Sequence, residues 1–306
     1  MAAEGVPRPP SETQRVSLDR PSFFTPKAVR KDLKNGCCYI VMTDTTCKLT
    51  YCRSPNQAGK RSSDREPDGQ KRADNVRRAK TAVLDIGQSN QWQYMATFTS
   101  GFEDPAADIR KLPKFLMNWN QKHGASIRYL LVYELGERGS RLHAHALLSG
   151  VPDAFIHRFQ PSEYRALPPD LKRLYSRYKA PSGGSLVGTC ESWKAGWSTL
   201  VPVDGSPRCV SYLTKYLTKS DVSLVTAFGG HAYFASHGLK RPKKCKIPAD
   251  IASAVFDRVP AGAWYKSFLG DDGGLLSCCY VFDADKVDAT LWSYYSTLYS
   301  ELQSGQ

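Results

Sequence analysis

The sequence predicts an α+β fold in which a central antiparallel sheet is flanked by helices. Apolar and β-branched runs typical of strands alternate with segments whose apolar residues recur at helical spacing. The predicted central strands are 91–100, 127–134 and 142–149, and the predicted helices beside them are 108–120 and 209–220. Since only 136–140 separates the last two strands, we expect them to pair as an antiparallel hairpin.

Further elements are predicted on both sides of this central part. The N-terminal side holds a polar, Pro-rich lead-in at 1–35, a short hairpin at 38–51, a linker at 53–72 and a basic helix at 74–84. The C-terminal side holds helices at 161–179 and 289–302 and strands at 188–203 and 231–236. We therefore divide the chain into a basic, partly flexible N-terminal region (1–73), a central domain (74–247) and an acidic, aromatic C-terminal extension (248–306).

The charge of the chain indicates an anionic partner. The formal net charge is +13, with the positive charge in residues 1–250 and an acidic excess after them. A basic body suits nucleic acid, although solvated surface charge is the alternative. No apolar run approaches the ~18 residues that a membrane span needs, and Met1–Pro10 has no apolar signal core. We expect a cytoplasmic protein that does not bind membranes.

The nine cysteines form no regular framework. Cys37, Cys38, Cys47 and Cys52 cluster, but their spacings differ from the paired knuckles of zinc sites. Buried or incidental reduced thiols are the favoured interpretation, and a zinc site is the alternative.

Two histidines within the strand 142–149 form a candidate metal site. Side chains alternate along a strand, so His143 and His145 point to the same face. Glu134 ends the preceding strand, and a tight hairpin would bring its carboxylate beside them; Glu137 is the rival third ligand. Two imidazoles and a carboxylate suit a catalytic divalent ion such as Mg²⁺ or Mn²⁺. The alternative is a pair of solvent-facing strand histidines.

Two tyrosines in the helix 209–220 are candidate nucleophiles. Tyr212 and Tyr216 are four residues apart and share a helical face, and Lys215 and Lys219 each follow a tyrosine by three residues. A metal ion or an ammonium group can favour phenolate, and lysine can balance charge on a phosphoryl transition state. The alternative is a packed amphipathic helix with surface lysines.

The order of these motifs, a Thr97-x-Thr99 strand, then Glu134 with His143-x-His145, then the tyrosine helix, resembles the HUH endonucleases that initiate rolling-circle replication. The likeness is closest to initiators of small single-stranded DNA phages and of bacterial plasmids or integrated elements, and it covers about residues 74–245. The segments 75–79, 90–99, 129–134 and 236–242 add to it. Ala144 stands where a bulky residue is usual, and Met95 and Ser100 replace frequent aromatics.

The resemblance implies a palm-like sheet of about five strands and a metal-dependent nickase. It makes Glu134, His143 and His145 the metal ligands and Tyr212 and Tyr216 the nucleophiles, with Lys215 and Lys219 beside them. One tyrosine would form a 5′-phosphotyrosine link and leave a 3′-OH primer for a host polymerase. No phosphate-cradling G-x-x-x-x-G-K-[ST] motif occurs, so we expect no nucleotide cofactor and a separate host helicase.

Two basic segments are predicted to track single-stranded DNA at the replication origin. Their residues are Arg77, Arg78, Lys240, Arg241, Lys243, Lys244 and Lys246. Three alternatives to an initiator stay open: an origin-binding protein without catalysis, a relaxase or transposase with the same chemistry, and an unrelated metal hydrolase.

Overall fold

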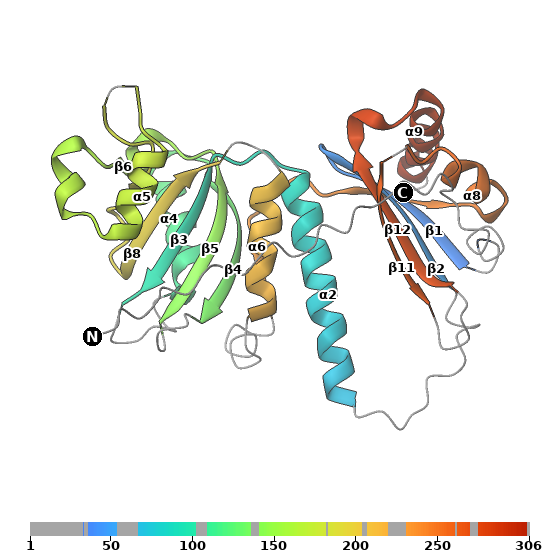
Figure 1. The fold of residues 1–306 in the computed structure, drawn as a ribbon, viewed down its shortest axis with the longest axis horizontal. Coiled ribbons are helices and arrows are strands. Elements are labelled where there is room, and N and C mark those ends of the chain that lie inside the picture. The colour runs from blue at the N-terminus through green and yellow to red at the C-terminus, as the bar shows by residue number, and fades with distance from the viewer. Residues whose placement is uncertain are drawn as a thin grey trace, which may run out of the picture.

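The fold is built around two antiparallel sheets, each with helices packed on it (Figure 1). The computed structural model describes residues 33, 36–53, 67–101, 109–135, 141–181, 183–203, 207–219, 231–260, 262–269 and 275–304. The predicted lead-in, most of the linker and the turn at 136–140 lie outside these ranges. The predicted α+β class, with antiparallel sheet flanked by helices, is confirmed.

The larger sheet has seven strands in the order β6-β7-β8-β3-β5-β4-β9. Its long strands are β3 (Tyr94–Ser100), β4 (Arg128–Leu135), β5 (Leu142–Ser149) and β8 (Gly196–Pro202). The short strands are β6 (His157–Arg158), β7 (Gly188–Thr189) and β9 (Phe234–Ala235). The predicted β4–β5 hairpin is confirmed, with Leu135 opposite Leu142 at its closed end.

Helices cover both faces of this sheet. On one face, α4 (Leu112–His123) buries Leu112, Leu116 and Trp119 against alternate residues of β3 and β5. Pro113 stands in its first turn, where the missing N–H costs little, so the predicted late start is confirmed. The other face packs on α6 (Pro207–Lys219), which lies beside α2 (Pro67–Gln88) in Figure 1.

The α2–α6 contact depends on one glycine. A Cβ atom on Gly87 of α2 would lie 2.2 Å from Cγ1 of Val210 on α6. The missing side chain therefore sets how closely the two helices approach.

The smaller sheet joins both ends of the chain. It has five strands in the order β10-β1-β2-β12-β11. These are β1 (Gly36–Met42), β2 (Thr46–Arg53), β10 (Lys243–Ile247), β11 (Trp264–Leu269) and β12 (Leu275–Asp283). Helices α8 (Ala249–Phe256) and α9 (Ala289–Ser304) pack on its buried face (Figure 1). The hairpin β1–β2 was predicted, but its pairing with β10 and β12 was not, because long-range strand partners leave no local pattern.

Two predicted elements differ from the structure. The linker predicted over 53–72 is wrong from Pro67 onward, where α2 begins two turns earlier than expected with a proline in its first turn. The helix predicted over 161–179 is divided into a 3₁₀ segment, Pro161–Ala166, and α5 (Pro169–Arg177). Pro169 forces Pro168 into an extended conformation, with ψ of 156°, which breaks the helix.

Contacts near the end of α2 tie the two sheets together. Lys48 of β2 forms an ion pair with Asp85 of α2. Lys240, just before β10, pairs with Asp44 at 2.7 Å, and its backbone N–H donates to Asn90 Oδ1 at 2.9 Å. None of the helices in the described part of the chain is long and apolar enough to cross a bilayer.

Candidate active site

The register of the larger sheet gathers the candidate residues on the face that packs against α6. Thr97 lies directly opposite His145, and Thr99 directly opposite His143. On the other side of β5, Glu134 lies directly opposite His143. Directly opposed residues of antiparallel strands share a face, so the Thr-x-Thr strand, the two histidines and the carboxylate form one cluster.

Each imidazole is held through Nδ1 by a threonine. The hydroxyl of Thr99 lies 2.9 Å from His143 Nδ1, and that of Thr97 lies 3.2 Å from His145 Nδ1. The second nitrogen of His145, Nε2, is 2.9 Å from Glu134 Oε2, and both side chains are buried. These contacts fix both ring orientations, a requirement for imidazoles that would bind a metal.

The tyrosine helix lies directly over this cluster. Its apolar residues Val210, Leu213 and Leu217 pack against the sheet and α2. One turn apart on the same helix, Tyr216 stacks on His145 with 3.6 Å between ring centroids, and Tyr212 meets Tyr216 edge-on at 5.2 Å. The structure therefore brings the predicted nucleophiles to the predicted metal ligands, across about 70 residues of sequence.

The two predicted lysines differ in what can be said of them. Lys215 Nζ lies 5.4 Å from the centroid of the Tyr212 ring, close enough for a cation–π contact. The side chain of Lys219 lies outside the described part of the structure. Lys215 is thus the lysine whose charge the structure places beside a tyrosine.

The surroundings shift the pKa values of two site residues. Burial, the hydrogen bond and charge of Tyr212, and the charge of Glu134 raise the pKa of Tyr216 well above its usual value. Burial and the positive charge of Arg141 lower the pKa of His143. In this arrangement Tyr216 is a protonated phenol, while His143 is a neutral imidazole whose lone pair is available to a metal.

The donor set of Glu134, His143 and His145 fits a divalent cation in its chemistry. Within the described ranges, however, no three His, Cys, Asp or Glu side chains already surround one point at ligand distance. His145 Nε2 is engaged with the carboxylate, and the two imidazole centroids are 6.2 Å apart. Binding a metal would therefore exchange the His145–Glu134 hydrogen bond for two ligand bonds. The rival ligand Glu137 lies outside the described residues.

The four clustered cysteines lie on two faces of the smaller sheet. Cys38 and Cys47 are buried against α8 and α9, whereas Cys37 and Cys52 lie directly opposite each other on the other face. Alternation along β1 and β2 thus separates the cluster into two pairs, and one ion could not contact all four thiols.

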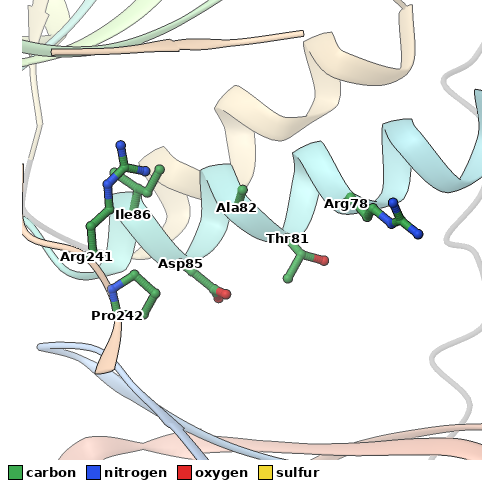
Figure 2. Close-up of a pocket in the computed structure, with 7 residues that line it drawn as sticks. All are labelled: Arg78, Thr81, Ala82, Asp85, Ile86, Arg241 and Pro242. Atoms are coloured by element: carbon green, nitrogen blue, oxygen red, sulfur yellow. The ribbon is translucent and has the colours of Figure 1, made fainter. Parts of the chain in front are cut away.

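The predicted DNA-binding residues occupy two places. Arg78 on α2 and Arg241 before β10 line one open pocket of about 430 Å³, together with Thr81 and Asp85 (Figure 2). The exposed Lys243, Lys244 and Lys246 follow along β10. The pocket joins segments 160 residues apart in sequence that were predicted separately. The side chain of Arg77 lies outside the described residues.

One exposed residue of the site face was predicted only as part of a strand. Trp197 of β8 lies directly opposite Thr99, on the face that carries the histidines. A tryptophan in an alternating strand usually indicates core, so the sequence offered no sign of its exposure.

Residues 93–221 match the profile of a family of replication-associated proteins, described under the name ORF2. The match covers less than half of the 306 residues but spans β3, β4, β5 and α6. Neither the curated proteins nor the solved structures include a match to the chain. The matched segment contains every candidate ligand and nucleophile, and the match supports a replication initiator family for this chain.

Proposed function

We propose that this protein initiates rolling-circle replication by nicking and rejoining single-stranded DNA through tyrosine, as a two-tyrosine member of the HUH endonucleases. The observation that carries the proposal is the contact between Tyr216 and His145, whose Nε2 also meets Glu134. This contact joins a candidate nucleophile to a candidate metal-binding cluster. An origin-binding protein without catalysis would have no need of that arrangement.

The strand-transfer step needs a nucleophile and an activated phosphate. A tyrosine oxygen attacks phosphorus, the bond to the 3′ oxygen breaks, and the products are a 5′-phosphotyrosine and a free 3′-OH. When bound by Glu134, His143 and His145, Mg²⁺ or Mn²⁺ would supply charge that polarises the scissile phosphate. Because one phosphoester replaces another, the link stays reactive enough for rejoining.

Two tyrosines on adjacent turns allow two cleavages in succession. While Tyr212 holds one DNA end, Tyr216 lies 5.2 Å away between ring centroids and can attack a second phosphate. Lys215 beside Tyr212 would balance charge on the phosphoryl group. The 3′ end would pass to a host polymerase, and unwinding would need a host helicase.

DNA would reach the site along the basic surface. Arg78 and Arg241 converge on the pocket in Figure 2, and the β10 lysines continue from it. Guanidinium groups pair well with phosphate, so this surface suits the DNA backbone. These contacts would position the strand without reading its sequence.

The test is a search for a covalent adduct. The protein is incubated with a 3′-labelled single-stranded library of randomised sequence and Mn²⁺, and products that survive denaturing detergent are counted. We expect a labelled adduct that requires the metal and disappears in the Tyr212→Phe/Tyr216→Phe double variant and in His143→Ala.

The outcomes separate the alternatives. Cleavage that persists in the double Phe variant would sink the proposal and favour a metal hydrolase. DNA binding with no adduct under any metal condition would favour a non-catalytic origin-binding protein.

A further inference from the structure

A tryptophan that the proposed chemistry does not use extends the row of site residues across the sheet. Trp197 on β8 is directly opposite Thr99, and Thr99 is directly opposite His143. These three residues therefore lie side by side on one face of three neighbouring strands. Strands lie about 4.8 Å apart, so the backbones of Trp197 and His143 are about 10 Å apart.

The indole of Trp197 faces solvent. It keeps 76% of its surface exposed, the largest fraction among the exposed large hydrophobic residues of the described chain. Among the described residues, no aromatic ring packs against it. Its neighbours Ser198 and Leu200 are buried on the opposite face. An exposed indole leaves a large apolar area in water, and here that area adjoins the site.

The backbone beneath Trp197 is closely held. A Cβ atom on the preceding residue, Gly196, would lie 1.9 Å from the carbonyl oxygen of Thr99. The absence of that side chain lets β8 approach β3 at the level of Trp197. The indole is thus presented from a fixed strand and not from a mobile loop.

We infer that Trp197 is the stacking platform for one base of the DNA strand bound at the site. This inference rests on the proposed function, because it takes His143 and its neighbours as the place of the scissile phosphate. The stacked base would lie within about two nucleotides of that phosphate. Stacking on an aromatic ring holds any base, since each has a π face. The platform would therefore position the strand over the tyrosines without selecting a sequence.

The platform is tested by binding, separately from cleavage. In the Tyr212→Phe/Tyr216→Phe background, the affinity for a fluorescein-labelled single strand of thymidines is measured by anisotropy. Trp197→Ala should weaken binding by about 5- to 100-fold, and Trp197→Phe should restore part of the loss. Trp264→Ala removes an exposed indole from the smaller sheet and should leave the affinity unchanged.

A second measurement follows the indole itself. Bound thymidines should quench tryptophan fluorescence in the parent protein, and Trp197→Phe should abolish most of that quenching. Quenching that survives the substitution would overturn the platform, because it would place the stacked base on another indole.

The binding and cleavage arms fail independently. If Trp197→Ala binds the strand within twofold of the parent while the wild-type protein forms the adduct, the platform is wrong and the proposed function stands. If Trp197→Ala loses affinity, Trp197→Phe recovers it and no adduct forms with any metal, the platform stands and the nicking chemistry is wrong.

Discussion

Tyr216 lies flat against His145, with 3.6 Å between the ring centroids and 8° between the ring planes. The stack covers the phenol, and its pKa is raised by burial, by the hydrogen bond and charge of Tyr212 and by the charge of Glu134. Tyr212 is 46% exposed. The tyrosine nearest the histidines is therefore the less accessible of the two and the harder to ionise.

This difference predicts which tyrosine attacks first. Tyr212→Phe should lower the initial rate of adduct formation by about tenfold or more, and Tyr216→Phe should lower it less, since a missing nucleophile cannot be replaced at the same geometry. The rate is measured from the detergent-stable adduct at early times. An equal loss in both variants would contradict the order, and unchanged melting temperatures serve as the control for folding.

The threonines under the histidines should control metal affinity. Thr99→Val removes the hydroxyl 2.9 Å from His143 Nδ1 and keeps the shape of the side chain. Partners of this kind usually contribute 10- to 100-fold, so we expect Mn²⁺ to bind about 10-fold more weakly or worse. Calorimetric titration gives the affinity. Thr199→Val, on the same face of β8 and opposite Thr97, is the matched control and should bind Mn²⁺ normally.

The site was more predictable from the sequence than the fold around it. Alternation in a strand placed His143 and His145 together, and a five-residue turn brought Glu134 to them, because both are local rules. The helical spacing likewise placed Tyr212 and Tyr216 on one face. Local rules could not say that α6 packs on this face of the sheet; only the resemblance to a known family implied it.

The smaller sheet shows what local patterns cannot give. Its strands come from residues 36–53, 243–247 and 264–283, with the whole larger sheet between them. Each strand is ordinary by composition, and nothing in one segment specifies a partner 200 residues away. The same reason hid the pocket between Arg78 and Arg241. Trp197 was missed because exposure depends on which elements leave a face open.

The joint between α2 and α6 should hold the tyrosines in place. Gly87→Ala puts a methyl group where Cγ1 of Val210 lies, so it should destabilise the protein by about 1–3 kcal/mol. Because α6 carries both tyrosines, adduct formation should fall as well. Val210→Ala removes the clashing atoms, and the double variant should recover part of both losses. Thermal unfolding and the adduct assay give the coupling, and purely additive losses would contradict the contact.

The arginine pocket should contribute to DNA affinity through charge. Arg78→Ala and Arg241→Ala should each weaken binding to single strands of any sequence and reduce the slope of log affinity against log salt by about 0.7. Anisotropy titrations between low and high salt measure both quantities. Arg173→Ala, an exposed arginine on α5, is the control for net charge and should keep the slope. Slopes equal to the wild type in both pocket variants would show that DNA avoids this surface.

The buried thiols of the smaller sheet make the stability of the protein depend on alkaline pH. Burial is the largest cause that raises the pKa of Cys38, Cys47 and Cys278, each to about 12. The unfolded chain releases these protons near pH 8.5 and the folded chain does not. Stability is therefore full below that pH and falls above it, by at most about 1.4 kcal/mol per thiol and pH unit.

Urea unfolding under reducing conditions tests this dependence. The midpoint should fall between pH 8.5 and 10.5, and Cys47→Ala should show a shallower fall because it lacks one of the titrating thiols. The change in slope is the readout, since the substitution also leaves a small cavity that lowers the midpoint at every pH. A slope equal to that of the wild type would mean that Cys47 ionises as readily in the folded chain as in the unfolded one. That result would contradict its burial beneath α8 and α9.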